Sequence, residues 1–435
     1  MQKIRVYEGY NLTHTSDTTV YHSRLIYPFQ GLRPQTESVD EVAAPPYDVL
    51  SSSEARLLAH DKPLSFLHIS KPEIDLPEGT DPFSNAVYEK GAENICSMLE
   101  SGVLVKDKNS CYYIYRLETE NHRQTGLVGV APISAYDENR IRKHEFTRPD
   151  KETDRVKQID YVNAQTGPVL LVHRPSESIS MILHEITMGP SLYEVELSDG
   201  VKHSLWLVED SAVKSRIDTA YEDLDCLYIA DGHHRSAAAS RVCDIRRSAN
   251  PNHNGSEAYN RFLIVAFPSN ELQILDYNRI VLDLNNLSSD NFLDRLNKDF
   301  EVIHSDHPVK PNCREVFGMY LEKNWYKLTL RLSPRREISI IEQLDVRILS
   351  DRILEPILGV GDLRTDPRIN FVGGVRGLEE LELSVDSGKW EVAFSLFPTE
   401  IEDLMTVADI GEVMPPKSTW FEPKLADGLV SYPID

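Results

Sequence analysis

The sequence is poor in cysteine and has no long apolar run. Its 435 residues include five cysteines, and no two of them form a CxxC pair, which favours reduced thiols over a disulfide framework. No stretch approaches the roughly 18 consecutive apolar residues of a membrane span, and the first residues lead into polar sequence without the apolar region of a secretory signal. We therefore expect a soluble cytoplasmic protein with no membrane partner.

The sequence also lacks an excess of positive charge. Lysine and arginine number 46 against 69 aspartates and glutamates, and the formal net charge is -23. Binding to DNA, RNA or an anionic membrane usually needs a basic face, so we expect no nucleic-acid partner. A local basic pocket remains compatible with this charge, because a few clustered side chains are enough to make one.

Helix and strand patterns alternate along the chain without the regular rhythm of βαβ units, which predicts an α+β fold. The composition, 41% hydrophobic and 26% charged, is typical of a globular protein, and the length allows two or three lobes. We divide the chain into a polar N-terminal extension at 1–20, an α+β core at 21–300, and a C-terminal α+β region at 301–435 that closes the same cleft.

Local patterns predict individual elements. Ser51 with Glu54, and Thr399 with Glu402, have the spacing of capping boxes, in which two side chains satisfy backbone N–H groups at a helix start. Alternating and apolar runs predict strands at 111–117, 126–133, 261–267, 325–332 and 391–397. Helices are expected at 85–101, 210–225, 292–299 and 342–358, and a loop at 247–256.

The segment 227–239 carries the strongest functional signal. An apolar, β-prone run ends at Asp231 and Gly232, and an Ala-rich helical stretch follows at once. Backbone N–H groups and the dipole at a helix start favour a bound anion, and Arg235 adds a guanidinium suited to two phosphate oxygens. We interpret this segment as a phosphate-holding turn with catalytic groups beside it.

A purely structural interpretation of this turn is that Asp231 caps the helix and that His233 and His234 bond to backbone carbonyls. Capping accounts for the aspartate but not for two histidines and an arginine in one turn, so a function is favoured. Adjacent residues at a helix start point in different directions, and we expect no metal shared by the two histidines.

Positive groups gather in a second segment of this acidic chain. It holds Lys143, His144 and Glu145, and Lys151 and Arg155 follow at helical spacing. One interpretation is a solvated helix with weak ion pairs. The other is a second wall of an anion site, with Glu145 or His144 as acid or base. The sequence pattern alone does not separate the two.

Two proline-stiffened loops carry further polar groups. A Pro-Pro pair presents Tyr47 and Asp48, whose residue types alone predict packing and turn formation. A second loop, 414–424, either forms a terminal strap over the core or offers lysines and hydroxyls to a phosphate or carboxylate ligand. The polar residues that we select from it are Lys417, Ser418 and Thr419.

The whole chain resembles the large family DUF1015. The resemblance is carried by segments that follow one another along almost the full length, namely 28–34, 44–49, 65–68, 143–145, 151–155, 230–235 and 414–424. Ser236 stands where the family pattern has an aromatic residue, and Phe146 with Thr147 varies the segment after the glutamate. The family label itself implies no activity.

The Asp-Gly-His-His-Arg turn at 231–235 is similar to the phosphate-binding turn of the ParB/sulfiredoxin-like superfamily. That group includes nucleotide-binding partition proteins, sulfiredoxins and free-serine kinases. Sulfiredoxin chemistry needs a reactive cysteine where this chain has His233 or His234, and a partition-type DNA clamp needs a basic helix-turn-helix. The resemblance therefore implies a ParB/sulfiredoxin-like core with large insertions. It also implies a kinase-like phosphotransferase for a small hydroxyl metabolite, with free serine favoured and Mg²⁺ and ATP or ADP as cofactors.

Phosphoryl transfer requires positioned phosphates and neutralised charge. Following the resemblance, we expect Arg235 and the helix start to hold the phosphates, Gly232 to let the backbone approach them, and His233 or His234 to donate to the transferred group. The remaining residues of the expected anion pocket are Lys143, His144, Lys151, Arg155, Lys417, Ser418 and Thr419.

The acceptor hydroxyl also needs a base. Asp231 is expected either to bind Mg²⁺ or to act as this base, with Glu145 or Asp48 as the alternative. Two other classes of function stay open. One is a regulatory protein that binds a nucleotide without chemistry, and the other is a phosphatase or hydrolase that uses the same anion site with water as acceptor.

Overall fold

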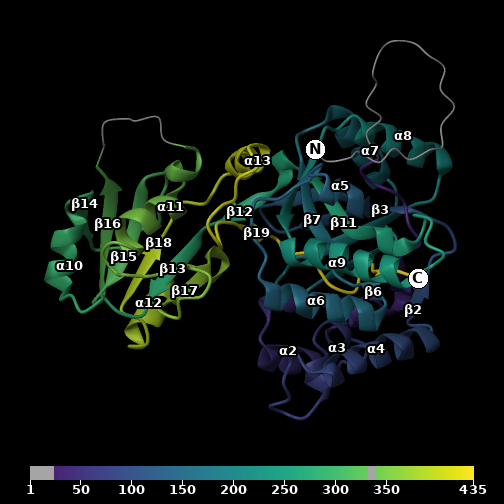
Figure 1. The fold of residues 1–435 in the computed structure, drawn as a ribbon, viewed down its shortest axis with the longest axis horizontal. Helices are drawn as coiled ribbons and strands as arrows, with labels where there is room; N and C mark the ends of the chain where they lie inside the picture. Colours follow the sequence, from purple (N-terminus) through teal and green to yellow (C-terminus); the bar gives the residue numbers. More distant parts are fainter. Residues whose placement is uncertain (1–23, 332–338) are drawn as a thin grey trace.

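The computed structural model describes residues 24–331 and 339–435. The polar extension expected at 1–20 lies outside these residues. The described chain forms two lobes, each built on one large β-sheet, and Figure 1 shows them side by side. We call the lobe with the eight-stranded sheet the first lobe and the lobe with the six-stranded sheet the second lobe.

The sheet of the first lobe is mixed. Its strand order is β5-β10-β7-β11-β4-β3-β9-β8, with β10 parallel to β5 and β11 parallel to β7, while the other neighbours run antiparallel. In chain order these strands are β3 (Tyr112–Glu118), β4 (Arg123–Pro132), β5 (Ile141–Arg142), β7 (Val169–His173), β8 (Tyr193–Glu196), β9 (Lys202–Val208), β10 (Leu227–Asp231) and β11 (Arg261–Pro268).

The centre of this sheet is almost entirely apolar. Strand β11 reads Arg-Phe-Leu-Ile-Val-Ala-Phe-Pro, and every residue after the arginine is buried, as expected for a strand covered on both faces. Strand β10 is buried up to Ala230, so Asp231 is its first residue to emerge from the core. The Asp231 carboxylate therefore lies at the end of β10, immediately before the next helix.

Three helices of the first lobe lie below the sheet in Figure 1. Helix α9 (His233–Ala249) packs on β7 and β11, and its small buried residues Ala238 and Ala239 allow a close approach. Helix α6 (Pro149–Val162) packs against α9, and α4 (Asn85–Glu100) packs against α6. Other helices of this lobe are α1 (Val39–Val42), α2 (Ser52–Ala59), α3 (Leu67–Ser70), α5 (Ile133–Asp137), α7 (Glu177–Thr187) and α8 (Ser211–Glu222).

The second lobe is an antiparallel sheet with helices. Its strand order is β14-β16-β15-β18-β13-β17, and α12 (Glu379–Asp386) packs on β13, β15 and β18 around the buried Leu381. The strands are β13 (Tyr277–Val281), β14 (Phe300–Ser305), β15 (Val316–Leu321), β16 (Asn324–Leu330), β17 (Ile369–Gly373) and β18 (Val392–Ser395), with α10 (Ser289–Leu296) and α11 (Asp345–Leu349) as further helices. One mixed and one antiparallel sheet confirm the α+β class.

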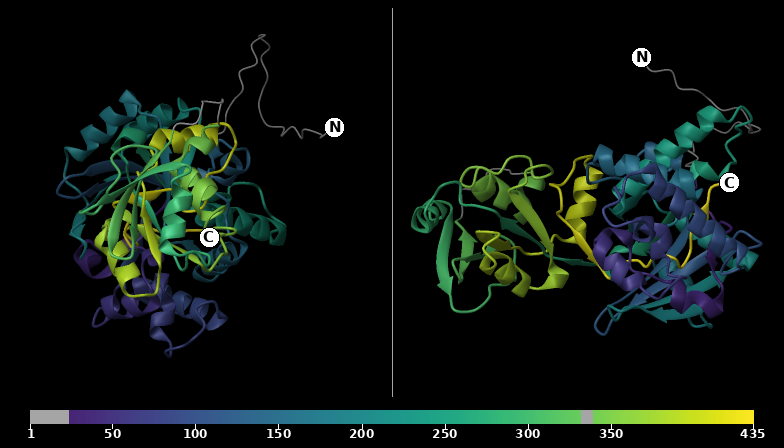
Figure 2. Two further views of the ribbon diagram at one scale, coloured as in Figure 1. Left: turned by 90° about the vertical axis from the view of Figure 1, so that its left-hand side faces the viewer. Right: turned by 90° about the horizontal axis from the view of Figure 1, so that it is seen from below.

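The chain crosses between the lobes twice. Strand β12 (Gln273–Leu275) leaves the first lobe and pairs with β19 (Trp420–Glu422), which belongs to the returning segment. Between β18 and β19, α13 (Ile401–Asp409) lies against the first lobe, where it contacts β10. The C-terminal segment then enters the first lobe, where β20 (Tyr432–Pro433) pairs with β6 (Ala164–Gln165), and Figure 2 shows this passage in yellow.

Several sequence-based predictions of elements are confirmed. Helix α2 starts with the expected capping box, in which the Ser51 hydroxyl accepts the Glu54 N–H at 3.2 Å and the Glu54 carboxylate accepts the Ser51 N–H at 2.7 Å. The helix expected at 85–101 is α4, and the paired strands expected at 111–117 and 126–133 are β3 and β4. Among the described residues, no helix has both the length and the apolar character that a membrane crossing requires.

Other predictions are wrong in their boundaries. The second capping box is made by Glu400 and Asp403, one residue later than expected, because the Thr399 hydroxyl donates to the Ser418 carbonyl at 2.8 Å. The helix expected at 342–358 begins only at Asp345, whose carboxylate accepts the Glu315 N–H at 2.9 Å, and it becomes a π-helix over Ser350–Leu354.

Two further boundaries shift for local reasons. Helix α10 starts three residues before the expected 292, because the Ser288 hydroxyl accepts the Asn291 N–H at 3.3 Å and so caps an earlier turn. Helix α9 continues to Ala249, into the segment expected as a loop from 247. Strand β16 ends at Leu330, and the last residue of the strand expected at 325–332 lies outside the described residues.

Candidate functional site

The site is built on the junction between β10 and α9. Asp231 ends the strand, Gly232 turns the chain with φ 100° and ψ 28°, and His233 begins the helix. A Cβ atom on Gly232 would lie 3.0 Å from Arg235 Nε and 3.3 Å from Val169 Cα. Glycine is required here because the backbone is left-handed and because the Arg235 side chain folds back over the turn.

Asp231 does not cap the helix, since the helix start has no side-chain capping bond. The structural interpretation of this aspartate is therefore wrong. Its Oδ2 instead lies 3.6 Å from Arg235 and 3.6 Å from Lys424. Burial favours the neutral acid, but the positive charges of Lys424 and Arg235 outweigh it and hold the pKa of Asp231 well below its usual range. The carboxylate is ionised at neutral pH.

Arg235 is the central cation of this junction. Its guanidinium donates to the Pro168 carbonyl and lies 3.8 Å from Asp48 Oδ2 as well as 3.6 Å from Asp231. The side chain is 15% exposed. Asp231, four residues earlier in the chain, and Asp48, from a distant segment, thus orient the guanidinium at the start of α9, which keeps its N–H groups positioned for an anion.

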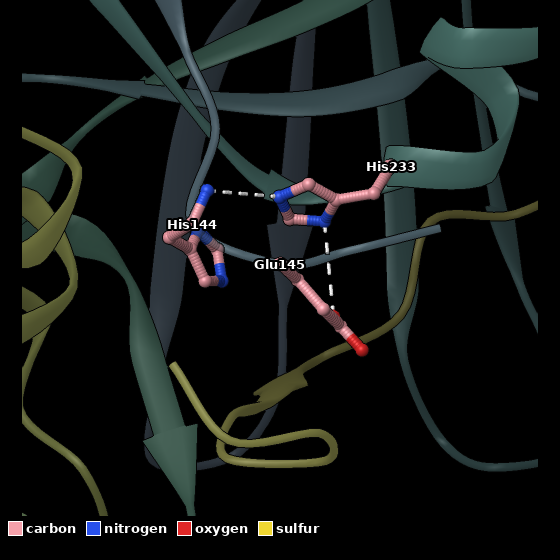
Figure 3. Close-up of side chains that lie close together, drawn as sticks. All are labelled: His144, Glu145 and His233. Atoms are coloured by element: carbon pink, nitrogen blue, oxygen red, sulfur yellow. Dashed lines mark hydrogen bonds and ion pairs between the residues drawn. The ribbon is translucent and has the colours of Figure 1, made fainter. Parts of the chain in front are cut away.

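The two histidines of the turn face different partners. His233 Nδ1 lies 3.9 Å from Glu145 Oε2, and the His144 N–H donates to His233 Nε2 at 3.5 Å (Figure 3). The Arg148 N–H donates to His234 Nε2 at 3.0 Å. Burial lowers the pKa of both histidines, that of His233 strongly, so both imidazoles are neutral at pH 7.

The loop at 414–424 closes over this junction. The Met414 N–H donates to the His144 carbonyl at 2.8 Å, and Arg279, a fully buried residue of β13, donates to the Lys417 carbonyl at 2.8 Å. Lys417 has a left-handed backbone with φ 59°. Burial raises the pKa of Glu145, and the nearby charge of Lys417 opposes that rise. The loop therefore places the Lys417 ammonium group near the Glu145 carboxyl group.

A cavity of about 700 Å³ lies in front of the junction, between the two lobes. From the first lobe it is lined by the turn and by the segments around α2, α4 and α6, and from the second lobe by residues 363–366 and 369–371. The predicted site residues that line it are Asp48, Glu145, Lys151, Arg155, Asp231, Gly232, His233, His234, Arg235 and Lys417.

Four predicted site residues do not line this cavity. The Lys143 ammonium lies 3.8 Å from the centre of the Tyr136 ring, and His144 is buried behind His233 with its ring edge-to-face at 4.5 Å. The buried Ser418 hydroxyl donates to the Pro415 carbonyl at 2.6 Å, and Thr419 follows it in the loop. Lys143, His144 and Ser418 therefore contribute to the walls of the cavity, because contacts within the protein already use their polar groups or rings.

Sequence reasoning missed three charged residues of the site. Lys424 pairs with Asp231, Arg279 holds the loop, and the buried Asp427 accepts the Tyr47 N–H at 3.2 Å. Lys424 was within the recognised loop, so its charge was a usable signal. Arg279 and Asp427 stand in ordinary strand and tail sequence, and only the fold brings them to the site.

Fold and site together define an α+β protein with a charged cavity between two lobes, centred on a strand–turn–helix junction. The family model described as "Protein of unknown function (DUF1015)" matches residues 26–347, and the chain belongs to this family. No protein with a curated description matches the chain.

Several solved structures are similar to the chain at low identity. A free serine kinase in complex with AMP is 16% identical, with 70% of this chain and 89% of that chain covered and a TM-score of 0.35. A conserved hypothetical protein from Pyrococcus furiosus is 16% identical, with 69% and 93% covered and a TM-score of 0.35. SbnI from Staphylococcus aureus is 10% identical, with 68% and 82% covered and a TM-score of 0.35.

Proposed function

We propose that this protein is a nucleotide-dependent phosphotransferase that acts on a small hydroxyl metabolite in the cytoplasm. The observation that carries the proposal is the grouping, in one cavity, of Arg235 and Lys417 beside the start of α9 with carboxylates able to act as base. A kinase and an anion sensor both need the cations, but only catalysis needs a proton acceptor next to them.

The phosphates of ATP or ADP are assigned to the start of α9. This helix has 17 residues, and its first backbone N–H groups have no intrahelical partners and are available to an anion. Arg235 offers a guanidinium fork, and Lys417 and Lys424 add positive charge from the loop that closes over the junction. His233 and His234, both neutral, are hydrogen-bond donors for the transferred group.

Mg²⁺ is assigned to Asp231, which is ionised and lines the cavity. Arg235 and Lys424 both approach Oδ2 of this carboxylate, so Oδ1 is the oxygen that we assign to the metal. Carboxylate oxygens and phosphate oxygens are the ligands that Mg²⁺ prefers. Bound there, the ion would neutralise charge on the nucleotide.

Glu145 is the base that we assign to the acceptor hydroxyl, with Asp48 as the alternative. Burial raises the pKa of Glu145, which makes its carboxylate a better proton acceptor than an exposed one. We assign a small hydroxyl compound as the acceptor. Within that class, the similarity of the turn at 231–235 to that of free-serine kinases favours free serine. We also infer that the C-terminal part of the chain closes the cleft over this acceptor.

The test is ³¹P NMR of the protein with Mg²⁺, ATP or ADP, and a pool of hydroxyl amino acids that includes L-serine. We expect a new phosphomonoester signal that is lost in Asp231→Asn. The matched control is Asp306→Asn, the same chemical change at a carboxylate that is 89% exposed on the second lobe. This control should retain the full rate of ester formation.

Each other outcome contradicts the proposal in a defined way. Free phosphate without an ester would indicate a hydrolase. Unchanged nucleotide with broadened resonances would indicate a nucleotide-binding regulator. Unchanged, sharp resonances would mean that the anion held at this turn is not a nucleotide.

A further inference from the structure

A cluster of three metal-ligating side chains lies beside the proposed nucleotide site. His144 and Glu145 come from the segment between β5 and α6, and His233 is the first residue of α9 (Figure 3). We propose that these three residues bind one late first-row divalent metal ion, of the Zn²⁺ or Co²⁺ class, at a site separate from the Mg²⁺ that accompanies the nucleotide.

The donor set favours this class of metal. Two imidazoles and one carboxylate are ligands of catalytic Zn²⁺ sites, whereas Mg²⁺ prefers oxygen ligands alone. One ligand atom from each residue lies within 4.8 Å of the others. Ligand atoms around a tetrahedral ion with bonds of about 2.1 Å lie about 3.4 Å apart, so the three side chains must move closer together to share one ion. The Glu145 side chain is 30% exposed and has room to move.

His144 supplies the observation that points to a missing ligand. The residue is 2% exposed, and its Nδ1 has no hydrogen-bond partner among the described residues. Histidines that bind metals present the lone pair of one ring nitrogen to the ion, and the unpaired Nδ1 of His144 is able to do so. A buried, unpaired nitrogen costs folding free energy, and a bound metal would remove that cost.

The distance between His233 Nδ1 and Glu145 Oε2 is compatible with one metal ion bound to both atoms. His233 Nδ1 and Glu145 Oε2 are 3.9 Å apart, longer than a hydrogen bond of about 2.7 to 3.2 Å. Metal on Nδ1 would leave the ring proton on Nε2, so the 3.5 Å contact from the His144 N–H would be given up. The contact is at the outer limit of a hydrogen bond, but the metal-bound form leaves the buried His144 N–H without this acceptor, a cost that the metal–ligand bonds must offset.

Each histidine offers one ring nitrogen to the cluster, and metal binding uses the neutral form of the imidazole. Glu145 and His233 line the cavity, and His144 lies behind them. A three-ligand site therefore has its open coordination position on the cavity side, where water or an oxygen of a substrate can enter.

This inference refines the proposed function without depending on it. With the ion bound, Glu145 and His233 are both ligands. The base for the acceptor is then Asp48, and the hydrogen-bond donor to the transferred group is His234, both of which line the same cavity. Metal binding can be measured without turnover, so the two proposals fail separately. Loss of phosphotransfer in Asp231→Asn with metal binding retained would support both.

The test is titration of the metal-free full chain with Co²⁺, followed by visible absorption and by equilibrium dialysis. We expect one Co²⁺ per chain with d–d bands of a low-coordinate site and no sulfur-to-metal charge-transfer band. His144→Gln and Glu145→Gln should each raise the Kd at least tenfold. Asp231→Asn should raise it less than either of these, because Asp231 is a neighbouring charge and not a ligand. The matched control is His304→Gln, which removes a half-exposed histidine 3.8 Å from Asp306.

The use of two variants guards against a folding defect in one of them. Glu145→Gln keeps the shape of a partly exposed side chain, so its effect on the Kd reports ligation even if the buried His144→Gln fails to fold. The proposal is overturned if the wild-type chain binds no Co²⁺, if binding is unchanged in Glu145→Gln, or if Asp231→Asn removes it.

Discussion

At the scale of single residues, the site holds a carboxylic acid, Asp427, that exchanges its proton near neutral pH. Asp427 is 3% exposed, and burial together with the neighbouring charge of Asp48 raises its pKa to about 7, while Arg235 opposes the rise. Its Oδ2 accepts the Tyr47 N–H at 3.2 Å. The proton on Asp427 thus limits the repulsion between two carboxylates that flank the same guanidinium.

This predicts a pH-dependent loss of stability. An acid whose folded-state pKa is above its unfolded value of about 3.9 keeps its proton in the folded protein while the unfolded chain loses it. The stabilising contribution is complete below about pH 4 and is lost as the pH rises through about 7. Between pH 5 and pH 7.5 the loss is about 2 to 3 kcal/mol. Asp427→Asn should remove it, because the amide oxygen still accepts the Tyr47 N–H.

Urea denaturation of both proteins at pH 5 and pH 7.5 checks this prediction. The variant should gain stability relative to the wild type at the higher pH. An equal difference between the two proteins at both pH values would show that Asp427 does not titrate in this range.

A second prediction at this scale concerns Arg235. Arg235→Lys keeps the charge but loses the fork that meets Asp231, Asp48 and the proposed phosphate. Losing one charge-assisted hydrogen bond costs about 1.5 to 3 kcal/mol, so the Kd for ADP should rise about 10- to 100-fold. Calorimetric titration measures it.

The matched control for this change is Arg241→Lys, which lies further along the same helix and pairs with Glu152 at 2.9 Å. That pair is partly exposed and distant from the junction, so ADP binding should be unchanged. Equal affinities of Arg235→Lys and the wild type would remove Arg235 from the anion site.

At the scale of elements, the junction between β10 and α9 depends on one backbone conformation. Gly232→Ala places a Cβ in the left-handed region, which costs about 1 to 2 kcal/mol, and presses it against Arg235 at 3.0 Å. We expect a lower melting temperature and, in addition, weaker ADP binding because the guanidinium is displaced.

Gly79→Ala separates these two effects. Gly79 has φ 87°, and nothing lies within 4 Å of an added Cβ. This variant should lose stability for the same backbone reason but bind ADP like the wild type. If both variants bind ADP equally well, Gly232 is required for the backbone conformation of the turn but does not determine the position of Arg235.

Elements also show where local sequence rules stop. The capping box of α2 was predicted because Ser51 and Glu54 satisfy each other within one turn. The start of α13 was misplaced by one residue because Thr399 bonds to Ser418, which is 19 positions away. A local pattern identified the helix, and a long-range hydrogen bond decided its first residue.

At the scale of the whole molecule, the chain's last residues are part of the first lobe's core. Strand β20 pairs with β6, and the segment 425–434 is buried at nine of its ten positions. Fully burying a large apolar side chain is worth about 1.5 to 3 kcal/mol, and a protein's net stability is only about 5 to 15 kcal/mol.

Ending the chain after Lys424 should therefore prevent folding of the first lobe. The control ends the chain after Ile434 and removes only Asp435, which is 72% exposed and pairs with Arg246. That change should shift stability by less than about 0.5 kcal/mol. Circular dichroism and thermal melting distinguish the two. If the protein that ends at Lys424 still folds, residues 425–435 pack on a core that is stable without them.

The sequence by itself determined the local chemistry of this protein. The strand, the glycine turn, the helix start and the order Asp231 to Arg235 follow from period, conformational preference and residue type within one short segment. The same local rules identified α2, α4 and the central strands, because their capping groups and apolar faces are encoded within a few residues.

Only the tertiary structure decided which groups meet at that turn. Asp48, Glu145, Arg279 and the tail that holds Lys424 and Asp427 are separated by long stretches of sequence, and the cavity itself lies between two lobes. The tertiary structure also gives Lys143 and Ser418 partners in the cavity walls, so neither residue lines the cavity. The physical reason is that burial and charge pairing depend on distance in space, and residue spacing along the chain does not encode that distance beyond a turn or a hairpin.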